Sequence, residues 1–282
     1  MPIASLPDRA VLAIAGDDAA GFLQGLVTCN VESLPAGEAR LGALLTPQGK
    51  ILFDFLLSRT AEGFHLDAPR AVLPDLIRRL TLYRLRAKVT LAETPLRVFA
   101  AWGTDPRGPE PAGAWLRDGR APGLGWRLNA PAGEGPAPDA AAEDFAVHRI
   151  ALGVPESGAD FALGDAFPHE ALMDQLGGLD FRKGCYVGQE VVSRMQHRGT
   201  ARTRVVPLHY PGGTAPAAGT PVTAGAKALG QTGSAAGDRG LGLLRLDRLG
   251  DAVAAGETIE AGGIPVAVGR PAFATFAVPG TA

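Results

Sequence analysis

The segment Lys183 to Glu190 (KGCYVGQE) concentrates side chains that could take part in chemistry. It contains one of the chain's two cysteines, two glycines, a lysine and a Gln–Glu pair. The following apolar residues recur at helical spacing and predict a helix from near Tyr186 to Gly199, after a tight turn and a strand ending at Phe181. Such a helix start would direct free backbone N–H groups and a positive dipole end at one point. The spacing therefore favours an anion site beside Lys183.

Two side chains of this segment could have specific roles. The Glu190 carboxylate could hold the flat N–H edge of a heterocycle through two parallel hydrogen bonds. At the opening of the predicted helix, Cys185 would have a raised thiolate fraction, which suits a redox contact, a transient sulfur or cluster contact, or a nucleophile. Plainer interpretations remain open: a strand–turn–helix corner with a surface Glu–Arg pair, and a buried inert thiol at Cys185.

The composition is that of an ordinary globular protein. With 282 residues, of which 46% are hydrophobic and 20% charged, the chain can form two or three domains with proper cores. A net charge of -2 gives no overall attraction to nucleic acid or anionic membranes. Cys29, Cys185 and the histidines lack metal-ligand spacing, so no metal site is predicted. Free thiols, no signal-peptide pattern and no apolar run of about 20 residues lead us to expect a cytoplasmic protein.

Helices and strands alternate in the N-terminal half and predict an α+β sandwich. A helix carrying Phe22, Leu23 and Leu26 should follow a cap at Asp17 or Asp18. The spacing of leucines and Ile77 predicts a second helix from about Pro69 to Tyr83. Strands are expected at residues 10–15, 41–45, 51–57, 63–67, 88–91 and 96–102, the second and third joined by the turn TPQGK.

The composition then changes twice. Between about 103 and 140 the chain is rich in Pro, Gly and Ala, with short strands expected around Trp115 and Trp126. A helix from Ala140 to Leu152 should follow and end at Gly153. After Arg202, short strands separated by glycine-rich turns predict a small all-β module.

KGCYVGQE resembles the signature of the YgfZ family, the folate-binding relatives of the glycine-cleavage T-protein that include a mitochondrial factor of iron–sulfur cluster assembly. Four other stretches resemble family segments in the same order: GFLQGLVTCNV (21–31), LLTPQGKILFDFLL (44–57), YRLRAKVT (83–90) and FPHEALMDQLGGLDF (167–181). The resemblance covers residues 11 to 205. It implies a T-protein-like folate-binding region of two α+β subdomains over 1–202 and a C-terminal β-barrel over 203–282.

The resemblance also implies a ligand, tetrahydrofolate or a related reduced folate. Glu190 matches the family glutamate that meets the pterin ring, and Phe145 falls where an aromatic residue lies against the folate. Tyr83 matches an aromatic position next to the site. The alternative to a folate contact is a core position for Phe145 and a helix-end position with an exposed hydroxyl for Tyr83. The predicted cofactor-binding residues are Tyr83, Phe145, Gln189, Glu190 and Arg198, and the predicted catalytic residues are Lys183 and Cys185.

Two locally basic stretches, 70–97 and 180–204, could hold the acidic tail of a folate. Solvated surface arginines are the alternative, and Arg198 could equally belong to a solvated helix end. A direct nucleic-acid groove is a weaker hypothesis, because no aromatic side chain interleaves with the second stretch after Tyr186.

The resemblance implies an accessory protein that binds folate and helps to mature or repair [4Fe–4S] proteins, indirectly supporting tRNA modification. Its partners would be folate and iron–sulfur assembly proteins or cluster-containing clients, without nucleic acid or membrane, and a monomer is expected. Two alternatives are a folate-dependent aminomethyl or one-carbon transferase and a scaffold that binds partners through its β-barrel. HLDAPR (His65 to Arg70) does not reproduce the Asn-Ala-type segment of the T-protein, so no catalytic role is carried over to Asp67.

Overall fold

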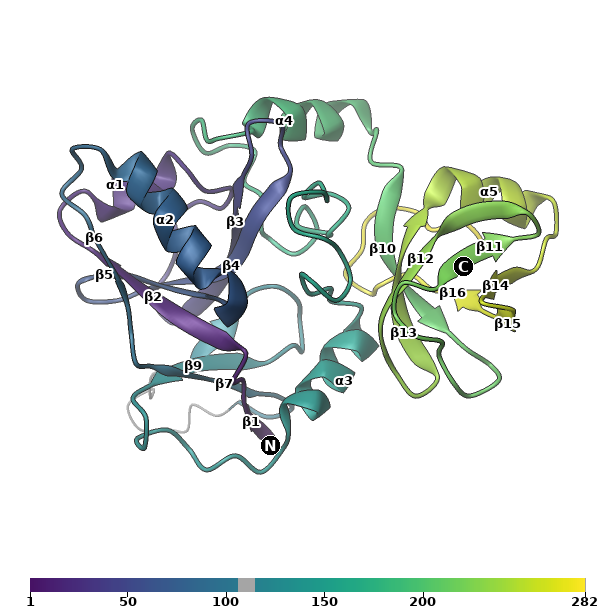
Figure 1. The fold of residues 1–282 in the computed structure, drawn as a ribbon, viewed down its shortest axis with the longest axis horizontal. Coiled ribbons are helices and arrows are strands. Elements are labelled where there is room, and N and C mark those ends of the chain that lie inside the picture. The colour runs from purple at the N-terminus through teal and green to yellow at the C-terminus, as the bar shows by residue number, and fades with distance from the viewer. Residues whose placement is uncertain (106–114, 282) are drawn as a thin grey trace. The chain divides into compact units, whose positions relative to one another are not determined.

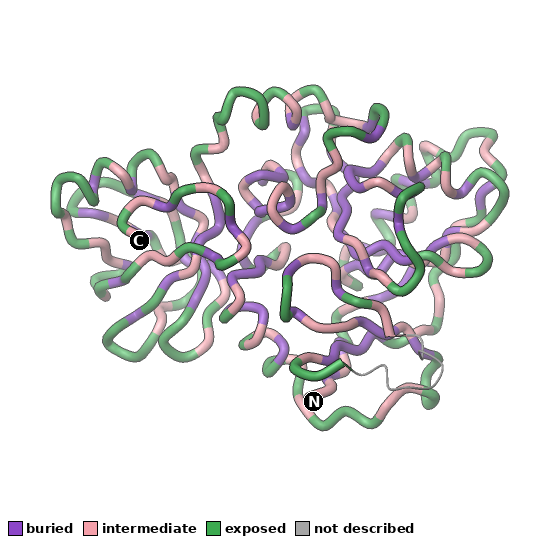
Figure 2. The backbone as a smooth tube through the Cα atoms, turned by 180° about the vertical axis from the view of Figure 1, so that it is seen from behind, coloured by how far each residue is buried: buried purple, intermediate pink, exposed green. Residues whose placement is uncertain are grey.

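The computed structural model describes residues 1–105 and 115–281. The chain divides into two compact units with cores of their own (Figure 1). The first unit consists of Met1–Phe145 and Leu176–Gln189, and the second of Ala146–Gln175 and Glu190–Ala282. Figure 2 shows the buried backbone concentrated along the strands of both units.

The first unit is built on one mixed sheet. Among the described residues it has nine strands in the order β1-β7-β9-β8-β3-β4-β5-β2-β6. Neighbours are antiparallel except for β3 and β8. The strands that the sequence predicted in the N-terminal half are confirmed. Their bounds are β1 Ile3–Ser5, β2 Arg9–Ala15, β3 Glu38–Leu45, β4 Ile51–Arg59, β5 Gly63–Pro69, β6 Thr90–Glu93, β7 Arg97–Ala101, β8 Leu116–Asp118 and β9 Trp126–Ala130.

Two helices complete the core of this unit. Helix α1 (Ala19–Gln24) buries Leu23, and α2 (Leu73–Arg84) buries the predicted stripe of leucines. A 3-10 turn at Arg70–Val72 precedes α2, so this helix begins later than predicted. Asp18 occupies the N-cap position of α1, but its carboxylate accepts a hydrogen bond from the backbone N–H of Lys88 (2.7 Å) instead of capping the helix.

The second unit contains the predicted all-β module. Its seven described strands follow the order β15-β14-β11-β12-β13-β10-β16. Helix α5 (Leu246–Ala254) packs Leu249 and Ala252 into the core beneath them. The strands are β10 Thr203–His209, β11 Pro221–Ala224, β12 Lys227–Ala236, β13 Arg239–Arg245, β14 Ile259–Ala261, β15 Ile264–Pro265 and β16 Ala267–Val268.

The compact units differ from the predicted domains 1–202 and 203–282. Residues 146–175 and 190–202 cluster with the C-terminal strands. The reason is a set of hydrogen bonds: the Val205 N–H donates to the carbonyl of Glu170 (2.9 Å), and the Arg204 guanidinium donates to both oxygens of Asp174 (2.7 and 3.0 Å). The domain boundary at 202 remains a prediction. Residues 106–114 of the predicted Pro/Gly-rich stretch lie outside the described residues.

Helices α3 (Ala142–Leu152) and α4 (Gln189–Arg198) both contain a boundary between the units. The end of α3 agrees with the prediction. The predicted strand ending at Phe181 is wrong, since residues 178–188 form no strand, and the helix expected from Tyr186 begins at Gln189. Gly188 has φ +80°, a left-handed conformation that a right-handed helix cannot contain.

Candidate functional site

The signature segment is anchored to the first unit by the buried side chain of Lys183. Its Nζ donates hydrogen bonds to the backbone carbonyls of Val27 (2.5 Å) and Cys29 (2.8 Å). Between them, the buried Thr28 hydroxyl donates to the carbonyl of Gly178 (2.6 Å). Burial lowers the pKa of Lys183. The ammonium is thus engaged by backbone oxygens of the loop that follows α1.

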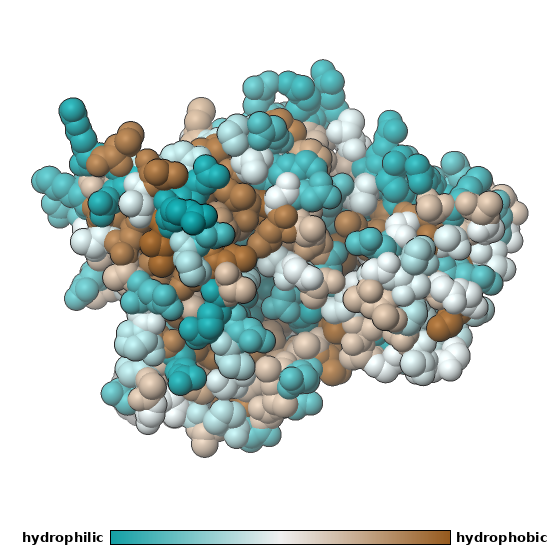
Figure 3. Space-filling view, viewed as in Figure 1, coloured by the Kyte–Doolittle hydropathy of each residue, from teal (hydrophilic) through white to brown (hydrophobic). Residues whose placement is uncertain are grey.

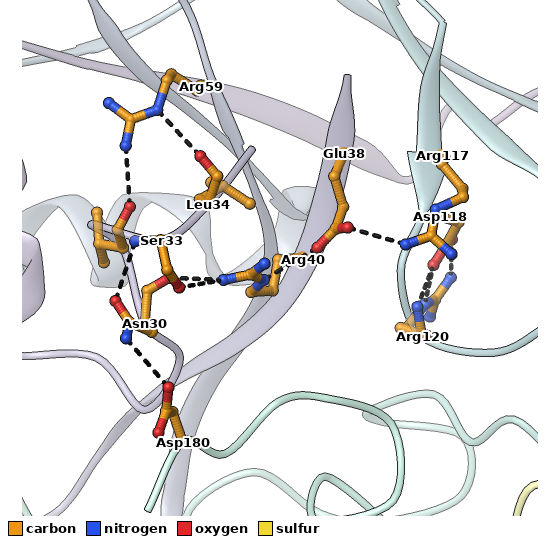
Figure 4. Close-up of polar contacts among 11 residues, drawn as sticks. Asn30, Ser33, Leu34, Glu38, Arg40, Arg59, Arg117, Asp118, Arg120 and Asp180 are labelled. Carbon is orange, nitrogen blue, oxygen red and sulfur yellow. Dashed lines mark hydrogen bonds and ion pairs between the residues drawn. The ribbon is translucent and has the colours of Figure 1, made fainter. Parts of the chain in front are cut away.

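Asp180 fixes the start of the same turn. Its Oδ1 accepts from the backbone N–H groups of Arg182 (2.7 Å) and Lys183 (3.1 Å), and Oδ2 accepts from Asn30 Nδ2 (3.1 Å). The net pKa of Asp180 is lowered. Burial alone would raise this pKa, but the hydrogen bonds to the carboxylate have the larger combined effect. Figure 4 shows the contact with Asn30, whose backbone carbonyl in turn accepts from Arg40 on β3 (2.9 Å).

The far end of the turn is fixed by Gly188. A Cβ at this position would lie 2.5 Å from the carbonyl oxygen of Thr46 in the β3–β4 hairpin, so only glycine permits this approach. Gln189 closes the turn, because its Oε1 accepts from the Tyr186 N–H (3.3 Å) while its own N–H donates to the Tyr186 carbonyl (3.3 Å). The turn is therefore held at both ends by side chains that hydrogen-bond to backbone groups: Asp180 and Lys183 at one end, and Gln189 at the other.

Cys185 lies between these two anchors with an exposed, free thiol. Its neighbour Gly184 has open space where a Cβ would stand. The predicted position of Cys185 at a helix start is wrong, because α4 begins four residues later. The anchored turn is therefore the feature that presents this thiol to solvent, and the predicted catalytic roles of Lys183 and Cys185 remain predictions.

Tyr186, the residue after Cys185, packs inward. Its ring is buried, with the Lys183 Nζ 5.4 Å from the ring centroid. Burial, and secondarily the charge of Asp180, raises the pKa of the hydroxyl to about 12. That hydroxyl has no hydrogen-bond partner among the described residues.

The other predicted ligand residues have different surroundings. Phe145 is buried in the first unit, with the Arg127 guanidinium 4.8 Å from its ring centroid and the Trp102 ring 5.6 Å away. Tyr83 is half-buried against the core of that unit. Glu190 belongs to the second unit, and its exposed carboxylate accepts from Arg194 (2.6 Å). Such a surface Glu–Arg pair is what the sequence offered as the alternative to a ligand contact for Glu190. Arg198 is exposed at the end of α4.

A buried charged cluster next to Phe145 was missed by the sequence reasoning. Asp118 accepts two hydrogen bonds from the Arg120 guanidinium (3.0 and 2.8 Å), one from the Arg120 N–H (3.2 Å) and one from Arg127 Nε (3.1 Å). Burial raises the pKa of Asp118, but the two arginines outweigh this effect and hold the pKa well below its usual range. The only available signal was the placement of Asp118 and Arg127 in the short strands expected around Trp115 and Trp126.

Two atoms near this cluster have unused hydrogen-bonding capacity. Arg127 Nη1 and Asp67 Oδ2 are buried and have no hydrogen-bond partner among the described residues. The other carboxylate oxygen of Asp67 accepts from Arg9 (2.5 Å). Because buried polar groups are normally paired, a donor and an acceptor of this kind fit a polar ligand or bound water.

Within residues 1–105 and 115–281, no group of three or more His, Cys, Asp or Glu side chains is placed to hold a metal ion. Nor does any helix of this part of the chain have the length and apolar character needed to cross a membrane.

Comparison with known proteins gives three concordant results. Residues 202–276 match the family model described as the CAF17 C-terminal beta-barrel domain. The iron–sulfur cluster assembly factor IBA57, mitochondrial, of Homo sapiens is 34% identical over 280 residues, covering 86% of this chain and 77% of that protein. The IBA57 homolog of Mycosarcoma maydis is 35% identical over 239 residues, covering 77% of this chain but only 59% of its own length.

The fold is similar to that of the glycine cleavage system aminomethyltransferase T from Bartonella henselae. The TM-score is 0.74, with 96% of this chain and 86% of that chain covered, at 18% sequence identity. This confirms the predicted T-protein-like α+β fold with a C-terminal β-barrel. The expectation of a cytoplasmic protein is contradicted, because the IBA57 relatives are named as mitochondrial proteins.

Proposed function

Because the chain belongs to the IBA57 family of iron–sulfur cluster assembly factors, we propose that it assists the maturation of iron–sulfur proteins. The family relationship extends over most of the chain, with 34% identity to the human protein over 86% of its residues. The clients we propose are [4Fe–4S] enzymes, including enzymes that modify tRNA. Accessory action without classical turnover is the form of activity we infer.

The observation that carries this proposal is the exposed Cys185 thiol on its anchored turn. Thiolates are the usual protein ligands of iron–sulfur clusters. Because Cys29 is buried and Cys185 is exposed, this protein would contribute one sulfur. The remaining cluster ligands would come from the donor or the client. A cluster would therefore be held only transiently, as a substrate in transfer.

Cys185→Ser should abolish the maturation activity, because an alcohol oxygen is a poor ligand for iron in place of a thiolate. The assay is the activity of [4Fe–4S] enzymes in cells that lack the native protein and express each variant. Cys29→Ser is the matched control. Its thiol is buried, and burial raises its pKa to about 11, so it should not react. Full rescue by Cys185→Ser would refute a sulfur contact.

We further propose a reduced folate as ligand. The similarity of the fold to an aminomethyltransferase supports it, as do the unpaired Arg127 Nη1 and Asp67 Oδ2, which suit a polar heterocycle. Phe145 is buried with Arg127 and Trp102 against its ring, so little of the ring is available for contact. The proposed contacts remain those carried over from the family pattern, at Tyr83, Phe145, Gln189, Glu190 and Arg198.

Glu190→Ala should weaken tetrahydrofolate binding about tenfold or more without lowering the melting temperature. The change removes a carboxylate that would pair with the pterin edge, whereas its exposed pair with Arg194 contributes only about 0.5 kcal/mol. Calorimetric titration measures the affinity, and Glu143→Ala on the exposed start of α3 is the control. Equal affinity in wild type and Glu190→Ala would contradict the assigned contact.

The same fold similarity favours a second candidate, a folate-dependent one-carbon transferase. The two candidates predict different chemistry for the bound folate. Conversion of tetrahydrofolate to methylenetetrahydrofolate with an aminomethyl donor would favour the transferase, and its absence would favour the accessory role.

A further inference from the structure

A basic surface with two protruding leucines surrounds the end of α2 in the first unit. We define the α2-end surface as the exposed side chains of residues 78–88. Leu85 is 87% exposed and Leu82 is 65% exposed, the two largest values among the large hydrophobic side chains of the described residues. Single exposed hydrophobic side chains are common on protein surfaces, whereas neighbouring ones can mark an interaction site.

The backbone at Leu85 shows that the fold does not require this side chain. Its φ of 45° and ψ of −106° correspond to the first central position of a type II′ turn, which normally contains glycine. The turn is closed by the Ala87 N–H donating to the Arg84 carbonyl (2.8 Å). A leucine here strains the backbone and makes no compensating buried contact. Backbone strain of this kind concentrates at functional sites.

Two hollows lie beside these leucines, and both are positively charged. The first, about 480 Å³, is lined by Arg84, Leu85, Arg86 and Lys88 opposite Asp17. The second, about 250 Å³, is lined by Arg78, Arg79 and Leu82 with one acidic residue, Asp75. Each hollow therefore has more cations than anions on its walls. In Figure 3, hydrophobic side chains interspersed with hydrophilic ones cover the region where Figure 1 has α1 and α2.

We propose that the α2-end surface is the docking site for an acidic protein partner, whose carboxylates meet the arginines and whose apolar hollow receives Leu85. The proposal rests on the assembly function proposed above, because such a factor must hold a cluster donor or client. Charge complementarity selects an acidic partner. Nucleic acid offers phosphates but no apolar hollow for a leucine. An anionic bilayer would attract the cations, but it has no side chains to fill the two hollows.

The partner is first identified by photo-cross-linking. The full chain carries benzoylphenylalanine at Leu82 in cells of its own host, and the same probe at Val253 on α5 is the control. The protein captured only from position 82 is purified, and its affinity is measured by calorimetry at about 50 and 300 mM salt. We expect an acidic protein whose binding weakens at least tenfold at the higher salt. A basic partner, or salt-independent binding, would overturn the proposal.

Variants separate docking from folding. Leu85→Gly and Arg86→Glu should each weaken binding at least tenfold, while Val253→Ala and Arg239→Glu stay within twofold of wild type. Leu85→Gly should melt at the same or a higher temperature, because glycine adopts this turn without strain. Binding by Leu85→Gly within twofold of wild type would overturn the proposal.

A second readout separates this proposal from the assembly function. Leu85→Gly could restore the activity of [4Fe–4S] enzymes as fully as wild type while Cys185→Ser does not. That result would overturn the proposed docking site and leave the assembly function standing. Leu85-dependent binding to vesicles containing about 30% phosphatidylserine, without a protein cross-link, would replace the protein partner by a membrane and overturn the proposal.

Discussion

Asp160→Ala should destabilise the second unit by about 4 kcal/mol, the range found when a buried ion pair loses one partner. The buried carboxylate accepts four hydrogen bonds. Its Oδ2 accepts from Arg149 Nη1 (2.8 Å) and the Glu156 N–H (2.9 Å). Its Oδ1 accepts from the N–H (2.7 Å) and hydroxyl (2.6 Å) of Ser234 on β12. Alanine would remove the acceptor of all four hydrogen bonds and break the link from Arg149 and Glu156 to Ser234 on β12.

The measurement must report on the second unit alone. All three tryptophans, Trp102, Trp115 and Trp126, lie in the first unit, so their fluorescence does not follow this change. Hydrogen exchange of the β12 and β13 amides provides the free energy of opening. Asp238→Ala, which removes only an exposed pair with His209, should cost less than about 1 kcal/mol. A loss below about 1 kcal/mol in Asp160→Ala would mean that the carboxylate is dispensable.

Lys183→Met should destabilise the first unit by about 3 kcal/mol. Methionine preserves the length of the side chain but leaves the carbonyls of Val27 and Cys29 without their donor, at about 1–3 kcal/mol each. Part of this loss is offset, because methionine avoids the desolvation cost of burying a charged ammonium. Tryptophan fluorescence during urea unfolding measures the change, because all the tryptophans belong to this unit.

The neighbouring Arg182→Met is the matched control, since Arg182 is exposed and should change stability by less than about 0.5 kcal/mol. A second readout is the reaction of Cys29 with a thiol reagent. Loosening of the loop after α1 should expose this buried thiol in Lys183→Met. Wild-type stability together with an unreactive Cys29 would rule out the anchoring role.

Elements with a clear apolar period could be predicted from the sequence, although their ends shift by a few residues in the structure. The buried stripe of α2 and the β3–β4 hairpin are examples, because local spacing and a Pro/Gly turn determine both. The start of α4 could not be predicted, because the left-handed Gly188 is imposed by its approach to Thr46, more than a hundred residues earlier. A local periodicity contains no information about such a contact.

The charged residues of the candidate site show the same limit. Lys183 was expected beside an anion, yet its ammonium is satisfied by carbonyl oxygens from a distant loop. Asp118 and Arg127 could not be predicted as a buried pair, because charged residues are usually exposed unless a buried partner is known. The pair between Glu190 and Arg194 is local, since the two residues are one helical turn apart. The sequence therefore indicated this surface pair as one of the two possible roles of Glu190. The exposure of Cys185 is likewise a local property.

The anchoring of the signature turn has a consequence for synthesis on the ribosome. Lys183 and Gly178 bind a loop that leaves the ribosome about 150 residues earlier. At roughly 5–20 residues per second, that loop waits roughly 8–30 s for its partners. When its last strand, β9, has been made, the sheet of the first unit still lacks the segment Leu176–Gln189. The nascent chain therefore cannot finish its first unit before most of the protein is translated.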